Sequence, residues 1–369
     1  MKVTRFGKAA AVLSVAALGL TACGSDNATG SAGGDAPAGD SSVSGTLTGI
    51  GSSAQNAAMD AWKAGFSAQH SGASLQYSPD GSGAGREAFI AGAAEFGGSD
   101  AYLKDEEMEA AKEVCGPNGA INIPAYISPI AIAYNLEGVD TLKLDADTIA
   151  KIFKQEITKW NAEEIAAQNE GVELPDTAIT VVHRSDESGT TENFVEYLAA
   201  AAKDVWTYDV SGDWPSAIQA ENAKGTSGVV STTTATDGAI TYADASAVGG
   251  LGTVSVKVGE EYTELSAEAA AKAVETSNPA AGRSENDMSL DLERDTTETG
   301  SYPVVLVSYE LFCTSYEDQE TVDLVKAFGE YVVSEQGQDD AANSAGSAPM
   351  SESLRERALA AIDSIEGAS

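Results

Sequence analysis

The stretch ITVVHRSDESGTTENFVEYLAAAA, residues 179–202, contains a strand pattern, a polar loop and a helix pattern in immediate succession. The four residues 179–182 are all β-branched or strongly apolar, which is typical of a buried strand. The segment 190–202 repeats apolar side chains on a helical period, with Phe194 and Leu198 four residues apart. This unit predicts an α/β fold.

The same alternation continues through the chain. Strand patterns occur at residues 75–77, 131–134, 179–182 and 304–307. Helices are predicted at residues 54–69, 84–94, 146–152, 190–202, 214–223, 267–277, 320–334 and 351–365. The polar segment 278–300 is predicted to be a long loop. The length exceeds that of one typical core, so we expect two domains.

The first 22 residues have the layout of a secretory signal peptide, with a basic start and a short apolar stretch. Leu20-Thr21-Ala22-Cys23 resembles a bacterial lipobox, which predicts lipidation of Cys23; the alternative is an ordinary signal with a chance cysteine. Residues 23–44 are predicted to be the lipidated cysteine and a flexible tether. We therefore expect an extracytoplasmic protein, lipid-anchored to the bacterial cell membrane, whose folded part starts near Gly45.

The composition is strongly acidic, with 57 Asp and Glu residues against 21 Lys and Arg residues and a net charge of −36. This charge argues against nucleic acid and anionic membrane surfaces as partners, so membrane contact is expected through the lipid anchor only. An anion site in such a chain must rely on short-range hydrogen bonds and a local cation. The plainer interpretation of the acidity is solubility or an extracellular adaptation.

The chain has few residues that could hold a metal. Besides Cys23 it contains only Cys115 and Cys313, together with two histidines, His70 and His183. This set leaves little material for a transition-metal site, and no cofactor is expected. Outside the cytoplasm the two remaining cysteines are compatible with one disulfide, with free buried thiols as the alternative.

Three stretches place small or hydroxylated residues where a predicted helix begins. They are GIGSSAQNAAMDAW from Gly49, GSGAGREAFIAGAAEF from Gly81 and DESGTTENFVEYLAAAA from Asp186. A helix N-terminus presents unpaired N–H groups and a partial positive charge, so each turn suits an oxyanion. Each could equally be a plain helix cap. Neither glycine-rich loop has the ending of a Walker A motif, which argues against nucleotide binding.

A carboxylate follows the fourth polar stretch, FGGSDAYL, residues 96–103. Asp100 beside an anion site is useful if the ligand still carries a proton that the carboxylate can accept. Phosphate is protonated near neutral pH, whereas sulfate has no proton to donate, so Asp100 would discriminate between them. The plainer interpretation of Asp100 is a turn aspartate.

Taken together, these motifs resemble the PstS family, the phosphate-binding lipoproteins of the high-affinity ABC phosphate transporter. The resemblance covers the chain from about Gly45 and includes ITKWN at 157–161, GTSGVV from Gly225 and GAITYAD from Gly238. It implies a periplasmic-binding-protein fold (type II), two α/β lobes with a ligand cleft between them. It also implies a solute-binding protein that captures inorganic phosphate, delivers it to the transmembrane subunits of an ABC permease and performs no catalysis.

The resemblance assigns phosphate-binding roles residue by residue. The ligand set that it implies is Ser52, Ser53, Ala54, Ser82, Asp100, Arg184, Ser188, Gly189 and Thr190. The first three would donate through backbone N–H groups and the Ser53 hydroxyl, and Asp186 would hold Arg184 in place. Glu187 stands where many relatives have glycine, so the path and charge of that turn are open at this stage.

The resemblance also implies the lobe boundaries. Lobe one would combine residues 45–127 with 304–369, lobe two would comprise 128–303, and the strands would cross near 124–130 and 302–306. Phosphate would then contact both lobes and favour their closure. Cys115 and Cys313 would lie in the same lobe, and a monomer is expected.

Three other functions stay open. The chain could be a receptor for another tetrahedral oxyanion, such as arsenate, a phosphonate, molybdate or sulfate. It could be a phosphate-ester or serine hydrolase using Ser188 or Ser82, although a nucleophilic serine needs a base and His183 should point to the opposite face of its strand. It could also be a surface lipoprotein for adhesion or phosphate sensing.

Overall fold

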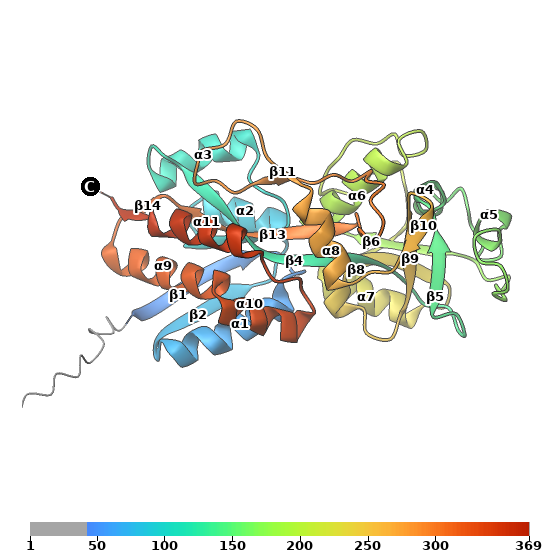
Figure 1. Ribbon diagram of the computed structural model, residues 1–369, viewed down its shortest axis with the longest axis horizontal. Helices are drawn as coiled ribbons and strands as arrows, with labels where there is room; N and C mark the ends of the chain where they lie inside the picture. The colour runs from blue at the N-terminus through green and yellow to red at the C-terminus, as the bar shows by residue number, and fades with distance from the viewer. Residues whose placement is uncertain (1–42, 369) are drawn as a thin grey trace, which may run out of the picture. The chain divides into compact units, whose positions relative to one another are not determined.

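The strand β4 (Ala120–Tyr134) joins two parts of one sheet in the computed structural model, which describes residues 43–368. Its first part pairs antiparallel with β13 (Val305–Cys313), and its second part pairs antiparallel with β8 (Ala239–Asp244). Every residue of β4 and β13 is buried, which explains their nearly continuous apolar sequences. Figure 1 shows both strands running between one group of helices that includes α1, α2 and α9 and another that includes α4, α6 and α7.

The sheet is mixed in direction. In the described chain this sheet has eleven strands. Eight of them follow the order β2-β1-β3-β13-β4-β8-β6-β7, and the other three branch from β4, because β9 pairs with β4, β5 and β10. Parallel pairs join β1 to β2 and β3, and β6 to β7 and β8. Parallel neighbours need long crossover connections, which helices supply here, so the predicted α/β class is confirmed. The remaining strands are β1 (Ser44–Gly51), β2 (Gly72–Ser78), β3 (Phe96–Ser99), β5 (Thr141–Leu144), β6 (Thr180–Arg184), β7 (Glu221–Ala223), β9 (Gly252–Val258) and β10 (Glu261–Thr263).

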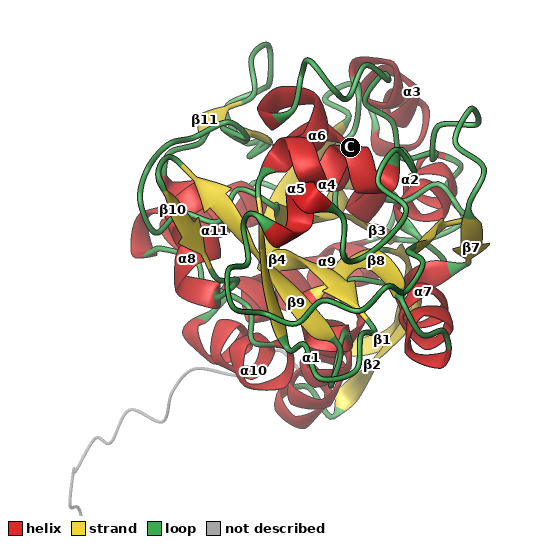
Figure 2. Cartoon of the chain, turned by 90° about the vertical axis from the view of Figure 1, so that its right-hand side faces the viewer, coloured by secondary structure: helices red, strands yellow, loops and turns green. Residues whose placement is uncertain are grey.

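Most predicted helices are present, with ends that differ by up to a few residues. They are α1 (Asn56–Gln69), α2 (Ser82–Ile90), α4 (Ala146–Phe153), α6 (Gly189–Ala201), α8 (Ala267–Glu275), α9 (Gln319–Val333) and α11 (Glu352–Asp363). Figure 2 shows helices in red around the strands in yellow. The predicted loop 278–300 contains only a small antiparallel pair, β11 (Asn278–Pro279) with β12 (Leu290–Asp291).

The helix predicted at residues 214–223 is wrong. Trp214 and Ile218 are buried, as the apolar pattern requires, but they lie in irregular backbone outside any helix. The end of the segment forms β7, which pairs parallel with β6, because its backbone groups find partners in the sheet. The structure adds helices that were not predicted, α3 (Asp105–Cys115), α5 (Glu163–Ala166), α7 (Gly225–Ala235) and α10 (Glu335–Ala345). It also adds a 3-10 turn η1 (Ala245–Ala247) and the short parallel pair β14 (Ser315–Tyr316) and β15 (Glu366–Gly367).

Aromatic side chains fill the core on both sides of β4. Trp62 and Trp160 are fully buried, as core roles for both tryptophans require. The Phe96 and Phe328 rings pack at 4.9 Å, and the Phe153 ring packs on the Phe194 ring of α6 at 4.7 Å. Each fully buried Phe side chain stabilises the fold by about 1.5–3 kcal/mol. This packing holds the start of α6 firmly against the sheet.

The described residues 43–368 belong to one compact unit. Strand β1 begins at Ser44, so the folded part starts one residue before Gly45 and overlaps the end of the predicted tether. The predicted signal peptide, Cys23 and the rest of the tether lie outside the described residues. Within residues 43–368, no helix is long and apolar enough to cross a membrane.

Cys115 and Cys313 form a disulfide, with their Cα atoms 4.7 Å apart. The bond joins the last residue of α3 to the last residue of β13. Both side chains are buried. The disulfide that the sequence left as one of two alternatives is therefore present in the structure.

Candidate functional site

Asp100 lies in the turn directly after β3 and is almost completely buried. Its Oδ2 atom accepts a hydrogen bond from the Thr190 hydroxyl at 2.8 Å, and its Oδ1 atom accepts one from the Ser308 hydroxyl at 2.9 Å. Its backbone N–H donates to Ser82 Oγ at 3.1 Å. The predicted acceptor therefore contacts the starts of both α2 and α6, through residues 82 and 190.

The starts of α2 and α6 pack against each other without intervening side chains. A Cβ at position 189 would lie 2.8 Å from Ser82 Oγ and 2.8 Å from the Asp100 Cβ. Only glycine fits such a close approach, which explains Gly189 in the loop that the sequence singled out. Ser188 caps α6, since its hydroxyl accepts from Thr191 N at 3.2 Å. Two of the predicted helix starts therefore converge on Asp100.

Arg184 ends β6 and is 3% exposed. Its Nε and Nη2 atoms donate to the two carboxylate oxygens of Asp186 at 2.8 and 2.5 Å. A bidentate pair of this kind fixes the plane of the guanidinium. A Cβ at position 81, the residue before α2, would lie 3.6 Å from Arg184 Nη2, so the guanidinium reaches the start of α2.

The Asp186 carboxyl group is held ionised by its surroundings. Burial by itself would raise its pKa, but the hydrogen bond and charge of Arg184 and a hydrogen bond from the Gly225 N–H outweigh burial and lower the pKa. The Gly225 bond is 3.0 Å long. Asp186 therefore ties Arg184 to the first residue of α7, a helix start that the sequence analysis did not place in the site.

In the first loop the backbone N–H groups of Ser52 and Ala54 have partners within the protein. The Ser52 N–H donates to the Gly98 carbonyl at 2.8 Å, and the Ala54 N–H donates to the Ser52 hydroxyl at 3.0 Å. The Ser52 bond continues the pairing of β1 with β3, whereas the Ala54 bond closes a local turn on the Ser52 side chain. Ser53 behaves differently, since its hydroxyl lies 3.0 Å from Thr226 Oγ1 and accepts from Thr226 N at 3.0 Å.

Ser53, Thr226 and Gly225 also line an open cavity of about 590 Å³. Its other lining residues include Asp80 and Lys224, which form an ion pair at 3.0 Å. The cavity lies between the starts of α1 and α7. It gives solvent access to the side of the site that Ser53 occupies.

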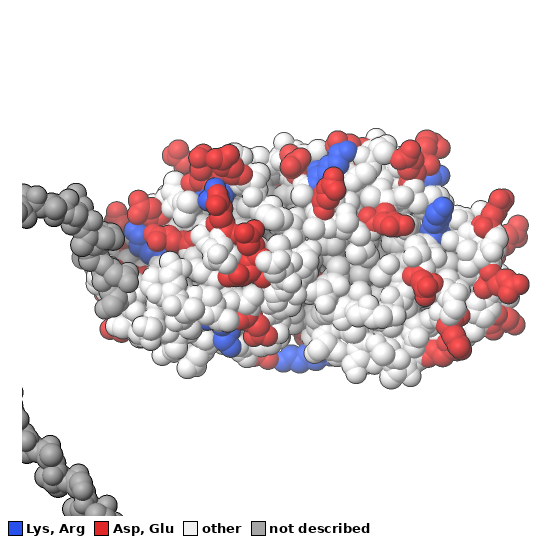
Figure 3. All heavy atoms as spheres, turned by 60° about the horizontal axis from the view of Figure 1, so that its bottom comes forward, with Lys and Arg blue, Asp and Glu red and all other residues white. Residues whose placement is uncertain are grey.

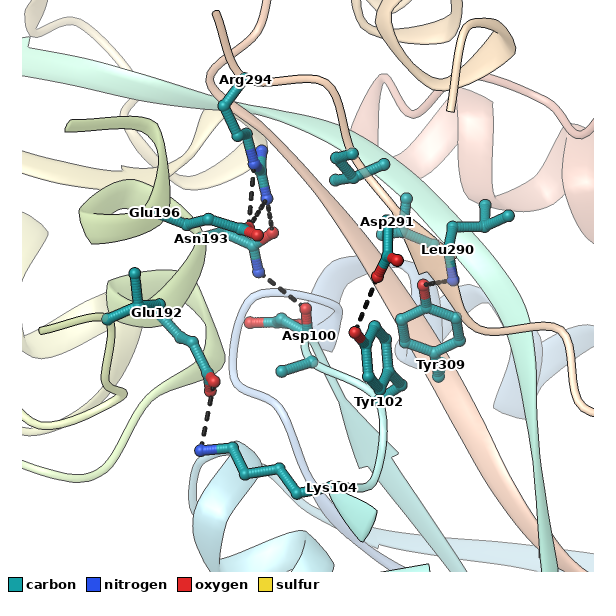
Figure 4. A pocket seen from close by; sticks show the side chains of 14 residues that line it. Asp100, Tyr102, Lys104, Glu192, Asn193, Glu196, Leu290, Asp291, Arg294 and Tyr309 are labelled. Carbon is teal, nitrogen blue, oxygen red and sulfur yellow. Dashed lines mark hydrogen bonds and ion pairs between the residues drawn. The ribbon is translucent and has the colours of Figure 1, made fainter. Parts of the chain in front are cut away.

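A second cavity, of about 150 Å³, lies beside the backbone of Asp100 (Figure 4). Asn193 donates to the Asp100 carbonyl oxygen at 2.7 Å, and Arg294 pairs with Glu196 at 2.9 Å and donates to the Asn193 side chain. Figure 4 also shows Lys104 paired with Glu192 of α6, at 3.2 Å. These contacts fix α6 relative to the Asp100 turn.

The sequence analysis missed residues that support the site. Ser308 lies in an apolar strand, and its hydroxyl oxygen also lies 3.0 Å from Gln55 Oε1. A lone serine in a fully buried strand was a signal that a buried polar partner exists. The residues Gly225 and Thr226 belong to GTSGVV, which has the same small and hydroxylated composition as the three loops that were singled out.

The two candidate nucleophiles are engaged in structural contacts. Ser188 Oγ caps α6, and Ser82 Oγ accepts from Asp100 N. The His183 Nδ1 atom lies 2.7 Å from the Arg184 carbonyl oxygen, and its ring stacks on Trp214 at 5.0 Å. Burial lowers the His183 pKa. Residues 43–368 contain no cluster of three or more His, Cys, Asp or Glu side chains that could hold a metal ion.

The chain matches the model of the PBP superfamily domain over residues 36–336. It is 36% identical to the phosphate-binding protein PstS 3 of Mycobacterium leprae, over 99% of this chain and all of the relative. It is 35% identical to PstS 2 of Mycobacterium tuberculosis, again over 99% of this chain and all of the relative. Both matches extend over nearly the whole chain.

Solved structures share the fold at lower identity. The periplasmic phosphate-binding protein PfluDING, solved with phosphate bound, has a TM-score of 0.70 at 22% identity, covering 85% of this chain and 93% of that one. A phosphate-binding protein from Stenotrophomonas maltophilia has a TM-score of 0.65 at 22% identity, covering 86% and 93%. The predicted two-lobed periplasmic-binding-protein fold is confirmed. Within the PBP superfamily, this chain belongs to the PstS family of phosphate-binding proteins.

Proposed function

We propose that this protein is an extracytoplasmic receptor that binds inorganic phosphate and delivers it to an ABC permease. The observation that carries the proposal is Asp100, a buried carboxylate whose side chain accepts only from hydroxyl groups in the described chain and which lies beside two helix starts. The PstS names of the relatives support the same ligand.

The chemistry of the site favours a protonated oxyanion. Helix N-termini and the Arg184 guanidinium provide donors to the unprotonated oxygens of phosphate. Asp100 provides an acceptor for its remaining proton, which sulfate lacks. Figure 3 shows more acidic than basic surface on this face of the molecule. Short-range hydrogen bonds, rather than long-range attraction, therefore select the ligand.

We assign nine residues and one supporting carboxylate to the site. Ser53, Ser82 and Asp100 would contact phosphate from one side, and Arg184, Ser188, Gly189 and Thr190 from the other, with Asp186 holding Arg184. Ser52 and Ala54 would contribute only if their N–H groups exchange their present partners for the ligand.

Lobe one would comprise residues 45–127 and 304–369, and lobe two would comprise 128–303. The change of partner along β4, from β13 to β8 at residues 129 and 130, supports a boundary there. Each lobe would then supply one half of the donor set, so phosphate would stabilise the arrangement in which the halves meet.

The lipid anchor at Cys23 would keep the receptor at the cell membrane, next to the permease. Metabolic labelling with a fatty acid tests the anchor: the wild-type chain should carry the label, and Cys23→Ala should lose it and appear in the medium. Unlabelled wild-type protein would contradict the anchor and leave phosphate binding untouched.

We also propose that the protein catalyses no reaction. His183 supports this view, because its ring contacts a backbone carbonyl and Trp214 rather than either candidate serine. Purified protein should therefore release no nitrophenol from p-nitrophenyl phosphate, and sustained turnover that Ser188→Ala abolishes would restore the hydrolase alternative.

The central experiment is calorimetric titration of residues 42–369, freed of bound ligand by partial unfolding and refolding. Phosphate should bind tightly at neutral pH and sulfate should give no heat of binding. Arsenate, which also carries a proton, should compete with phosphate. Tight sulfate binding would contradict the role of Asp100, and the absence of phosphate binding would contradict the proposed ligand.

A further inference from the structure

Glu187 and Arg86 form an ion pair between the Arg184 loop and helix α2, with the Arg86 side chain 4% and the Glu187 side chain 28% exposed. We propose that this pair is a latch between the two lobes, which sets the population of the closed cleft and so the affinity for phosphate. The inference rests on the proposed function and on the proposed lobe boundaries, under which Arg86 belongs to lobe one and Glu187 to lobe two.

Arg86 lies on α2 with its side chain 4% exposed. Its three groups of donors are all used: Nη2 donates to Glu187 Oε1 at 2.7 Å, Nε to Glu107 Oε1 at 2.9 Å and Nη1 to Ser99 Oγ at 3.1 Å. The Ser99 hydroxyl also donates to the Ala101 carbonyl at 2.5 Å. Arg86 therefore supports the turn that carries Asp100.

Glu187 lies between Asp186 and Ser188, in the loop that leads into α6. Its carboxylate fits between two glycines: a Cβ at position 83 would lie 2.1 Å from Oε2, and one at position 212 would lie 2.4 Å from Oε1. Burial raises the pKa of Glu187, with the charge of Arg86 acting against this shift. Its Oε2 atom has no hydrogen-bond partner in the described chain, so Arg86 is the main group that compensates the buried charge.

Other ion pairs join the same two halves, but in each of them one side chain is more than half exposed. Lys104 pairs with Glu192 with 52% of the lysine side chain exposed, and Lys224 pairs with Asp80 with 63% of the lysine side chain exposed. Exposed pairs contribute little, whereas breaking a buried pair leaves an uncompensated charge. In the Arg86–Glu187 pair neither side chain is more than 28% exposed, so this pair couples the halves more strongly than the other ion pairs do.

Opening the cleft would separate Arg86 from Glu187 but leave the Glu107 and Asp186 pairs intact, because those lie within single lobes. The latch therefore stabilises the closed arrangement before phosphate arrives. Apparent affinity is proportional to the fraction of protein already in the binding-competent state. A weaker latch should lower the affinity and speed the release of phosphate.

The test compares Glu187→Gln with Glu107→Gln in residues 42–369. Both substitutions remove one carboxylate from the same guanidinium, but only the first acts between the lobes. Small-angle X-ray scattering without ligand should give a larger radius of gyration for Glu187→Gln alone. Phosphate affinity should fall about 5- to 150-fold, chiefly through faster dissociation. Glu107→Gln should leave the dissociation rate within about twofold while lowering thermal stability.

Arg86→Lys is a second variant in case Glu187→Gln fails to fold. It keeps the charge but loses the forked geometry, so it should shift both measurements in the same direction by a smaller amount. Unchanged scattering and unchanged release in a folded Glu187→Gln or Arg86→Lys variant would overturn the latch while the proposed function stands. If the variant has a larger radius of gyration but the wild-type protein does not bind phosphate, the latch stands and phosphate is not the ligand.

Discussion

The two halves of the site carry opposite charges but are stabilised in different ways. Asp100 is surrounded by neutral donors, the hydroxyls of Thr190 and Ser308. Arg184 is paired with a full countercharge, the carboxylate of Asp186. The positive charge of Arg184 is therefore already neutralised by a neighbouring side chain, whereas the negative charge of Asp100 is not.

This difference shows how an acidic protein can bind an anion selectively. A neutralised guanidinium gives direction to hydrogen bonds but little net attraction. An un-neutralised carboxylate rejects any anion that cannot offer a proton in return. The predictions below test each half in turn, beginning with the largest expected effect.

Arg184→Ala should weaken phosphate binding about a hundredfold or more, since it removes the cation and leaves Asp186 buried without it. Calorimetry measures the change, and circular dichroism checks that the variant is folded. Arg283→Ala is the matched control, because Arg283 donates to the Leu103 carbonyl outside the site. Equal losses in the two variants would mean that Arg184 acts only through stability.

Asp100→Asn should weaken phosphate binding about 10- to 100-fold, because a charged acceptor is replaced by a weaker one that can also donate. The ratio of phosphate to sulfate affinity should fall at the same time. Asp291→Asn tests specificity, since Asp291 accepts from Tyr102 in the neighbouring cavity. Preserved discrimination in Asp100→Asn would refute its role as the selective acceptor.

Asp186→Asn should lower the free energy of unfolding at neutral pH by about 1–3 kcal/mol. The Asp186 pKa is lower in the folded state than in the unfolded state, so the stability it contributes is present above the unfolded value of about 4. That stability is lost as the pH falls through the folded pKa. Urea titrations from pH 7 to pH 3 should show the two proteins converging. A constant difference across this range would contradict the linkage.

Ser53→Ala should have the smallest effect, about a fivefold loss of phosphate affinity, because it removes one neutral hydroxyl that bonds to Thr226. Ser74→Ala, in an exposed hydroxyl pair with Thr46, provides the control. A loss as large as that of Asp100→Asn would show that the Ser53 contact with the start of α7 matters as much for phosphate affinity as the charge of Asp100.

The fold was predictable where apolar periodicity was strong and failed where local propensity was weak. Helix α7 is rich in Thr, Ser and Gly, which are poor helix formers, and Thr232, Thr233 and Thr234 bond back to carbonyls four residues earlier. Helix α3 buries only Ala111 and Cys115, so its sequence reads as polar. Residues 214–223 have helical spacing, but their last part forms a strand because β6 offers backbone partners.

The site was predictable only in its local motifs. Composition indicates the three loops and Asp100, because helix caps and turns favour particular residue types. The residues that support these motifs lie far away in the sequence. Ser308 is 208 residues from Asp100, Thr226 is 173 residues from Ser53, and Arg86 is 101 residues from Glu187. Such pairings depend on the packing of the whole chain, which no local pattern specifies.

The disulfide has a topological consequence. Cys115 and Cys313 are 198 residues apart, so the covalent bond closes a ring that contains all of residues 128–303. A protease that cuts once anywhere between these cysteines leaves a single covalent molecule, because the two fragments stay joined at the ends of α3 and β13. A single cut in the half of the site that carries Arg184 therefore leaves that half covalently attached to the rest of the protein.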